Sequence, residues 1–266
     1  MKKVYSFCLA LILAVSTTLT VSAQATEKRT MQAGMTGNFG INMVNVLDNH
    51  MEKESFNHDL SIGMAIHTSF KSAPNLGLAT GFEFDFTKLN YAFSSDSVFY
   101  RYDDTQIFNK GQVGGTEFLL RDRKMSNVSV SIPLMMLFRT EAVGDWKFFG
   151  KFGLRNSFLI SQKITDNGFD VTQVGAVQVN TAKENTNMKS FGENFFYRGS
   201  VGFSAGAEWN FIGSTSLVPE LGFYYGLTPL HFRAIGDNFT LYEADGTYFY
   251  PRAKQNQLIL KVSILF

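Results

Sequence analysis

The chain has few of the residues that cross-link a fold, bind soft metals or interrupt strands. Among 266 residues there are one cysteine and five prolines. The cysteine, Cys8, lies in the apolar N-terminal segment, so the rest of the chain has no thiol for a disulfide, a thiolate metal site or nucleophilic catalysis. Neither sign of charge dominates, since 24 basic residues balance 23 acidic ones, and no charge run indicates a nucleic-acid-binding surface. Beyond the N-terminal segment, no apolar run is long enough for a transmembrane helix.

The N-terminus has the pattern of a secretory signal peptide. Lys2 and Lys3 precede an apolar run over residues 4–15, and small residues follow it. This run is too short to cross a hydrocarbon core of about 30 Å. We therefore predict a signal peptide over 1–23, with cleavage after residue 23 or 25, and a single domain over 24–266.

Aromatic residues and glycine are abundant, and they alternate. The stretch LGLATGFEFDFTK at 76–88 places leucine and phenylalanine on one phase and glycine, alanine and acids on the other. Successive side chains of a strand point to opposite faces, so each such segment has one apolar face and one small or charged face. Eight segments share this pattern and are predicted to be strands: 31–42, 58–70, 76–92, 125–139, 147–162, 195–211, 217–232 and 254–266.

The connections between these segments alternate between short and long. An even number of long strands, with short turns at one end and long loops at the other, is typical of bacterial outer-membrane barrels. The predicted fold is all-β, an eight-stranded antiparallel up-and-down transmembrane β-barrel. Its long outer loops are expected near 43–57, 93–124, 163–194 and 233–253.

The alternation does not by itself say which face is outside, because a lipocalin-like soluble barrel has the inverse arrangement. The charged residues indicate the membrane arrangement, with the apolar face outside. A basic side chain facing lipid at the bilayer midplane costs about 2–4 kcal/mol, so the charged phase must face inward. The predicted interior charge network has eight members: Glu83, Asp85, Lys151, Arg155, Arg198, Glu208, Glu220 and Lys261.

Counting from the short turns, this network divides into two charge-balanced layers. The lower layer contains Lys151, Glu208, Glu220 and Lys261, and the other four residues form the upper layer. Buried charges need partners, so we expect a filled interior rather than an open pore. A second expectation concerns Pro133, which falls inside a strand and predicts a bulge or kink there.

The segment GFSAG at 202–206 matches the G-x-S-x-G spacing of a serine nucleophile. In hydrolases this serine lies on a sharp strand-to-helix turn, whereas residues 197–211 form one unbroken alternating segment. Ser204 is therefore interpreted as an inward-facing strand residue. We predict no catalytic residue, no metal site and no cofactor.

Four segments resemble the PorT-like outer-membrane β-barrel family of the Bacteroidetes. They are VSIPLMM at 130–136, FGKFGL at 149–154, the segment 202–209 and LGFYYGL at 221–227. Ser131 stands where that family often has an acid. The resemblance implies an eight-stranded barrel in the outer membrane. The founding member assists type IX secretion and gliding, a role that belongs to a narrow branch.

The predicted function is non-enzymatic: a structural or interaction role in the cell envelope, with accessory work in protein secretion as one form of it. A small-solute pore, a lipid-modifying outer-membrane enzyme and an adhesin acting through the outer loops are the alternatives. The expected partners are outer-membrane lipid and lipopolysaccharide, an unidentified envelope protein and the outer-membrane assembly machinery, but no nucleic acid. The C-terminal strand ends on Phe266, which resembles the signal that this machinery recognises.

Overall fold

The structure is a computed structural model that describes residues 30–47, 49–52, 57–93, 98–174, 177–189, 195–231 and 239–266. The predicted signal peptide lies outside the described residues. Within them, no helix has the length and apolarity needed to cross a membrane.

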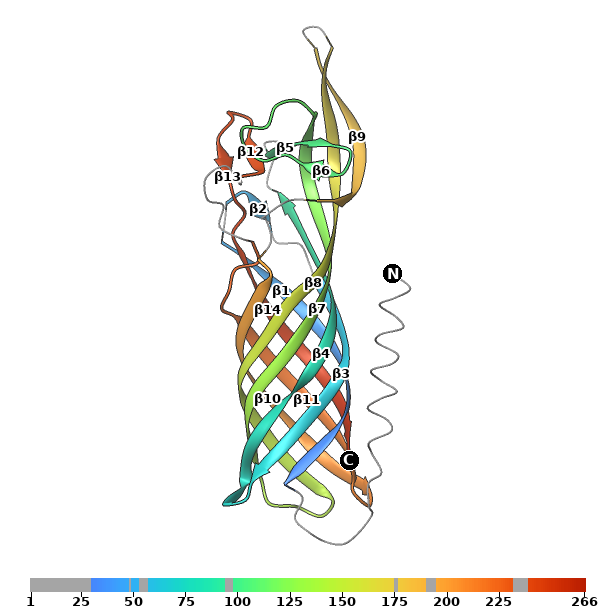
Figure 1. Cartoon of the computed structure of the whole chain (residues 1–266), viewed down its shortest axis with the longest axis vertical. Helices are drawn as coiled ribbons and strands as arrows, with labels where there is room; N and C mark the ends of the chain where they lie inside the picture. Colours follow the sequence, from blue (N-terminus) through green and yellow to red (C-terminus); the bar gives the residue numbers. More distant parts are fainter. Residues whose placement is uncertain are drawn as a thin grey trace.

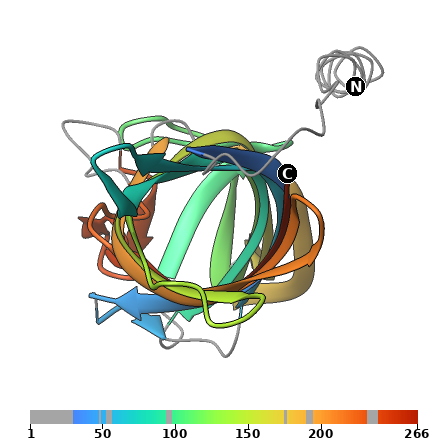
Figure 2. The same ribbon diagram turned by 90° about the horizontal axis from the view of Figure 1, so that it is seen from below.

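Eight long strands form a closed antiparallel barrel, which Figure 1 shows from the side and Figure 2 from below. Each strand pairs with the next in chain order, and the last pairs with the first, from Gly34 opposite Leu265 to Val46 opposite Ala253. The predicted eight-stranded barrel is thus confirmed. Its strands are β1 (Met31–Val46), β3 (Asn57–Phe70), β4 (Ala73–Phe93), β7 (Thr116–Arg139), β8 (Trp146–Val174), β10 (Tyr197–Ile212), β11 (Thr215–Gly226) and β14 (Ala253–Leu265).

At one end of the barrel, the turn end, short connections join β3 to β4, β7 to β8 and β10 to β11. At the other end the connections fold into a second body, the outer head, at the top of Figure 1. Outer-membrane barrels keep short turns in the periplasm and long connections outside, which places the head on the cell surface. The head contains β2 (Met51–Glu52), β5 (Val98–Asp103), β6 (Gln106–Ile107), β9 (Val177–Met188), β12 (Leu241–Glu243) and β13 (Tyr248–Phe249).

Two of the predicted long outer loops, near 93–124 and 163–194, contain strands in the structure. Strand β7 already begins at Thr116, and β8 and β9 form a long hairpin that continues to Met188. The strands extend because β7 and β8 remain paired above the predicted barrel, from Met125 opposite Ile164 to Glu117 opposite Val171.

The outer wall changes from apolar to polar at one level. On β7, the outward side chains from Val128 to Phe138 are apolar, whereas those at Lys124 and Ser126 are polar. On β4 the change falls at the same level, because Phe86 lies opposite Val128 and Lys88 lies opposite Ser126. The apolar stretch of β7 spans about the 9–11 residues that a tilted strand needs to cross a bilayer.

The interior changes in the opposite sense at this level. Below it, Asp85 and Ser129 are buried inside the barrel, whereas above it Leu89 and Met125 are buried inside the head. A polar interior behind an apolar wall suits a bilayer, and an apolar interior behind a polar wall suits water. The level at which the apolar side chains change from the outer to the inner face of the strands therefore marks the outer boundary of the membrane.

Pro133 does not produce the bulge expected there. The register of β7 against β4 is the same on both sides of Pro133. Against β8, the register of β7 shifts between Leu120 and Asp122 and between Val128 and Ser129, and neither shift is at the proline. Pairing with β4 is interrupted opposite Gly81, whose φ is 152°. The missing N–H of the proline is thus accommodated by a local gap in one ladder, and Thr80 Oγ1 donates to the Pro133 carbonyl at 2.8 Å.

Candidate functional site

A cluster of four charged side chains occupies the middle of the barrel. Arg155 from β8 contacts both Glu83 and Asp85 of β4, and its Nη2 lies 2.8 Å from Asp85 Oδ1. Lys261 from β14 reaches across the interior to the other oxygen of Glu83. Ser131 donates to the second oxygen of Asp85. All four charged groups are buried, so each depends on the others for compensation.

A second line of charges lies nearer the turn end. Lys151 Nζ is 2.6 Å from Glu220 Oε2 and 2.9 Å from His67 Nε2. The other ring nitrogen, Nδ1, lies 3.4 Å from Glu208, whose carboxylate also accepts from Arg139 Nε at 2.8 Å. Since a lysine can only donate, His67 Nε2 accepts and the proton of a neutral ring is on Nδ1. His67 therefore connects the Glu220–Lys151 pair to the Glu208–Arg139 pair.

Arg198 is placed differently from the other seven predicted residues. Its Nη1 donates to Gln255 Oε1 at 3.2 Å, while Nε and Nη2 are buried without a hydrogen-bond partner among the described residues. It lines a polar cavity of about 30 Å³, together with Asp85 and Gln257. That volume holds about one or two water molecules, which can hydrate the guanidinium.

These contacts alter the predicted two-layer arrangement. Lys261 was assigned to the lower layer, yet it binds Glu83 of the upper one, and Glu208 pairs with Arg139 instead of a predicted member. Barrel strands are tilted and staggered, so residues counted equally from the turns do not lie at equal heights. The sequence prediction also missed His67 and Arg139, although both share the inward phase of their strands and could have been found by that parity.

Ser204 lies in the middle of β10, where it is paired with Gly222 of β11 on one side and Lys151 of β8 on the other. It is buried inside the barrel. The strand continues past it to Ile212, so the sharp turn that exposes a hydrolase nucleophile is not formed at this residue.

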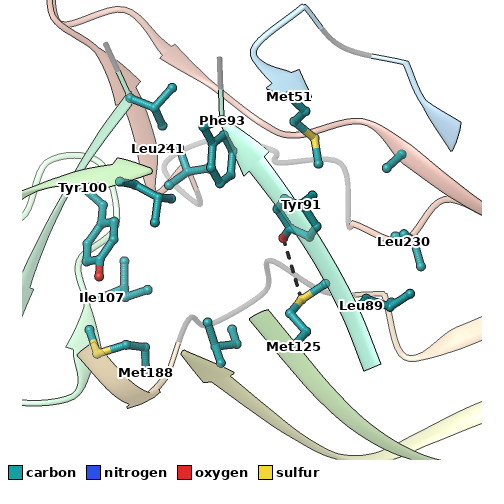
Figure 3. Close-up of a cluster of buried hydrophobic side chains, with 14 of the residues drawn as sticks. Met51, Leu89, Tyr91, Phe93, Tyr100, Ile107, Met125, Met188, Leu230 and Leu241 are labelled. Atoms are coloured by element: carbon teal, nitrogen blue, oxygen red, sulfur yellow. Dashed lines mark hydrogen bonds between the residues drawn. The ribbon is translucent and has the colours of Figure 1, made fainter. Parts of the chain in front are cut away.

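A cluster of buried apolar side chains, the roof cluster, closes the barrel above the charges (Figure 3). Tyr91 is central to it; its hydroxyl points to Met125 Sδ at 3.7 Å, and its ring meets Phe93 edge-on with centroids 5.5 Å apart. The cluster draws on ten strands and the segment after β11, and its members include Val44, Met51, Leu89, Tyr100, Ile107, Met188, Leu230 and Leu241. Burying a side chain of this size stabilises a fold by about 1.5–3 kcal/mol, so the roof is a core in its own right.

One ion pair is buried next to the roof cluster. Arg123 donates to both oxygens of Asp166, from Nε at 2.7 Å and from Nη2 at 2.8 Å, and both side chains are fully buried. The guanidinium also lies over the Tyr100 ring, 5.9 Å from its centroid. Burial, and the negative charge of Asp166, raise the pKa of Tyr100 above its usual range, so the phenol remains neutral. This pair ties β7 to β8 inside the head.

The β8–β9 hairpin is attached to the head through Lys183. Its ammonium contacts the Tyr102 hydroxyl on β5 and lies 2.9 Å from Asp170 Oδ2 on β8. Hydrogen bonds to Tyr102 and Asp170 raise the pKa of Lys183 above its ordinary value of 10.5.

This shift predicts that the hairpin attachment weakens at high pH. Because the folded pKa is raised, the stabilisation is complete below about pH 10.5 and is lost as the pH rises through the folded pKa. The effect is small, since Lys183 is 42% exposed. The rate of cleavage within the hairpin by an alkaline protease should increase through this pH window. The Lys183→Gln variant should be cleaved faster than the wild type at neutral pH, and its cleavage rate should not show the additional increase at high pH. If its cleavage rate depends on pH as in the wild type, Lys183 does not hold the hairpin.

Comparison with known proteins agrees with this architecture. Residues 22–231 match the family model described as outer membrane protein beta-barrel domain, which covers most of the chain. The chain therefore belongs to this family, and it is a protein of the outer membrane. Comparison with curated proteins finds no matching relative.

Several solved outer-membrane barrels are similar in structure. Ail, the attachment invasion locus protein of Yersinia pestis, is 10% identical, with 88% of this chain and 98% of that chain covered and a TM-score of 0.35. OprG from Pseudomonas aeruginosa is 9% identical, with 90% and 96% covered and a TM-score of 0.41. The outer membrane protease OmpT from Escherichia coli is 10% identical, with 92% and 99% covered and a TM-score of 0.30.

Proposed function

We propose that this protein is a non-enzymatic, non-conducting barrel whose outer head contacts another component of the cell envelope. The observation that carries the proposal is the double closure of the barrel. Paired charges fill its middle, and the roof cluster seals it above. The head remains available to a partner, and its β8–β9 hairpin is exposed over residues 177–184.

The residues that would suggest catalysis are held inside the barrel wall. His67 lies between Lys151 and Glu208, and Ser204 lies within a continuous strand. Both are buried in the barrel interior, where an acyl chain or peptide would have to displace paired charges. These contacts favour an interaction role over a lipid-modifying enzyme.

The finer proposal is a PorT-like protein that assists protein secretion. The four segments that resemble this family, at 130–136, 149–154, 202–209 and 221–227, fall on β7, β8, β10 and β11. These strands are consecutive neighbours in the barrel, so the resemblance covers one continuous wall.

The proposed assembly signal is at the turn end. Phe266 is 41% exposed, and its backbone N–H donates to the Ala33 carbonyl at 2.9 Å, next to the start of β1. We propose that the outer-membrane assembly machinery binds this aromatic end before the barrel closes.

Conductance and crosslinking test the general proposal. In a planar bilayer the purified barrel should give no channel steps; steps of uniform size would contradict the filled interior. A photocrosslinking residue at Asn180, on the exposed hairpin, should give a discrete adduct with an envelope component in intact cells. The control position is Asp145, exposed at the turn end. Equal adducts at both positions, or none at Asn180, would contradict a role for the head.

The secretion role has its own test. Deleting the gene should reduce the amount of secreted protein in the medium, and a chain lacking the hairpin tip at 172–182 should fail to restore it. The shortened chain must still reach the outer membrane, as judged by fractionation. Normal secretion in the deletion strain would overturn the secretion role while leaving the interaction role to the crosslinking result.

A further inference from the structure

Three lysines lie together on the outer wall, directly above the apolar band. Lys88 on β4 and Lys163 on β8 are both opposite Ser126 of β7, one on each side. Lys124 is two residues from Ser126 on the same face of β7, which makes it the diagonal neighbour of both. Diagonal neighbours on one face are about 7–8 Å apart, within reach of long side chains. The three side chains therefore form a triangle around Ser126, and all are exposed.

The lysine triangle carries an excess of positive charge. None of the three lysines forms an ion pair with the residues that the structure describes. Asp122 lies one step further up β7, but its carboxylate accepts a hydrogen bond from Asn167 at 2.7 Å. Like charges at adjacent positions of a sheet repel each other, so the site gains stability from an external anion.

An apolar groove lies on the adjoining strands β14, β1 and β3, and its edge reaches β4 below Lys88. Gly37 on β1 is surrounded by Phe39, Leu60, Ile62, Phe86 and Leu260, which line a groove of about 470 Å³ on the lipid-facing surface. A Cβ added at Gly37 would meet no atom within 4 Å, so the hollow arises at the glycine. Phe86, at its upper edge, is two residues below Lys88, a distance of about 7 Å along the strand.

We propose that the lysine triangle and the Gly37 groove form one binding site for a phosphate-bearing lipid of the outer leaflet, of the lipopolysaccharide type. The phosphates lie at the boundary between apolar and polar wall, where the three ammonium groups bind them. An acyl chain of the same lipid fills the groove below. Basic side chains at a membrane surface attract anionic lipid in this way. The site lies on the outer wall at the membrane boundary and does not include the exposed hairpin residues 177–184 that are proposed to contact a partner.

The test is binding of lipid A to the detergent-solubilised full-length barrel, measured by displacement of a fluorescent lipid A. Diphosphorylated lipid A should bind more tightly than the same lipid without phosphates, and inorganic phosphate should not compete at equal concentration. The triple variant Lys88→Gln, Lys124→Gln, Lys163→Gln should bind on the order of 100-fold more weakly, because each lysine contributes roughly a fivefold factor. The control variant Lys71→Gln, Lys110→Gln, Lys147→Gln removes the same charge elsewhere and should bind as the wild type does.

A second pair of variants tests the groove. Gly37→Leu fills it and should weaken binding on the order of tenfold, equivalent to about two lost methylene contacts. Ala205→Leu places the same leucine side chain at an exposed small residue on β10 and should leave binding unchanged. Equal binding by the two triple variants, or competition by inorganic phosphate as strong as that of lipid A, would overturn the site. Heat-dependent gel mobility of every variant shows that the barrel is folded, so loss of binding is not loss of structure.

Discussion

Replacing Arg155 with methionine is expected to destabilise the barrel by about 3–5 kcal/mol. The guanidinium compensates two carboxylates, Glu83 and Asp85, and all three groups are buried. Methionine fills most of the volume but leaves Asp85 without a cation and Glu83 with only Lys261. Urea unfolding of the barrel in lipid vesicles measures the loss, with the fluorescence of Trp146 and Trp209 as the signal. These two indoles stack at the turn end, 5.5 Å apart, and therefore report the opening of the barrel itself.

Arg198→Met is the matched control for this prediction. Arg198 is also inside the barrel, but the described residues give it one hydrogen bond, to Gln255, and no ion pair. Its removal breaks no ion pair among the described residues, so the free energy of unfolding should change by less than about 1 kcal/mol. If the two variants lose equal stability, the pairing at Arg155 is not what stabilises the interior.

Replacing Arg123 with methionine is expected to open the outer head without unfolding the barrel. The change leaves Asp166 buried without its bidentate partner, at a cost of about 3–5 kcal/mol. Both residues lie above the apolar band, so the cost falls on the head. Amide hydrogen exchange in β5 and β9 should accelerate strongly, while the urea midpoint reported by the tryptophans at the turn end should stay near that of the wild type.

Lys124→Met controls for the change at the neighbouring position, because Lys124 is exposed and unpaired among the described residues. It should leave exchange in the head unchanged. A large shift of the tryptophan midpoint in Arg123→Met would show that head and barrel unfold as one unit, contrary to the separation between the roof cluster and the interior charges.

The sequence predicted the barrel because one physical rule applies along each of its eight membrane strands. The bilayer requires apolar side chains outside and excludes charge from that face, so residues such as Phe84 and Glu83 must alternate. The strands of the head were not predicted because they do not show the alternation of an outward apolar face and an inward polar face. In β9 most side chains meet water on both faces, and in the upper part of β7 the apolar phase turns inward.

The interior charges were likewise predicted only in part from the sequence. Strand parity alone placed the predicted charged residues on the inward face, and the same parity contains Arg139 and His67. Parity does not give height, and so it could not show that Lys261 reaches Glu83 or that Arg198 forms no ion pair with the described residues. Those contacts depend on the stagger between strands, which closure of the barrel sets.

The sequence by itself determined which face of each strand meets lipid, since period-two alternation and the cost of exposing charge to hydrocarbon are local properties. Only the tertiary structure decided which charges pair, where the roof cluster closes the barrel, and that Lys88, Lys124 and Lys163 surround Ser126. These are properties of register between strands far apart in the chain, and a one-residue change of register would exchange the faces of a whole strand.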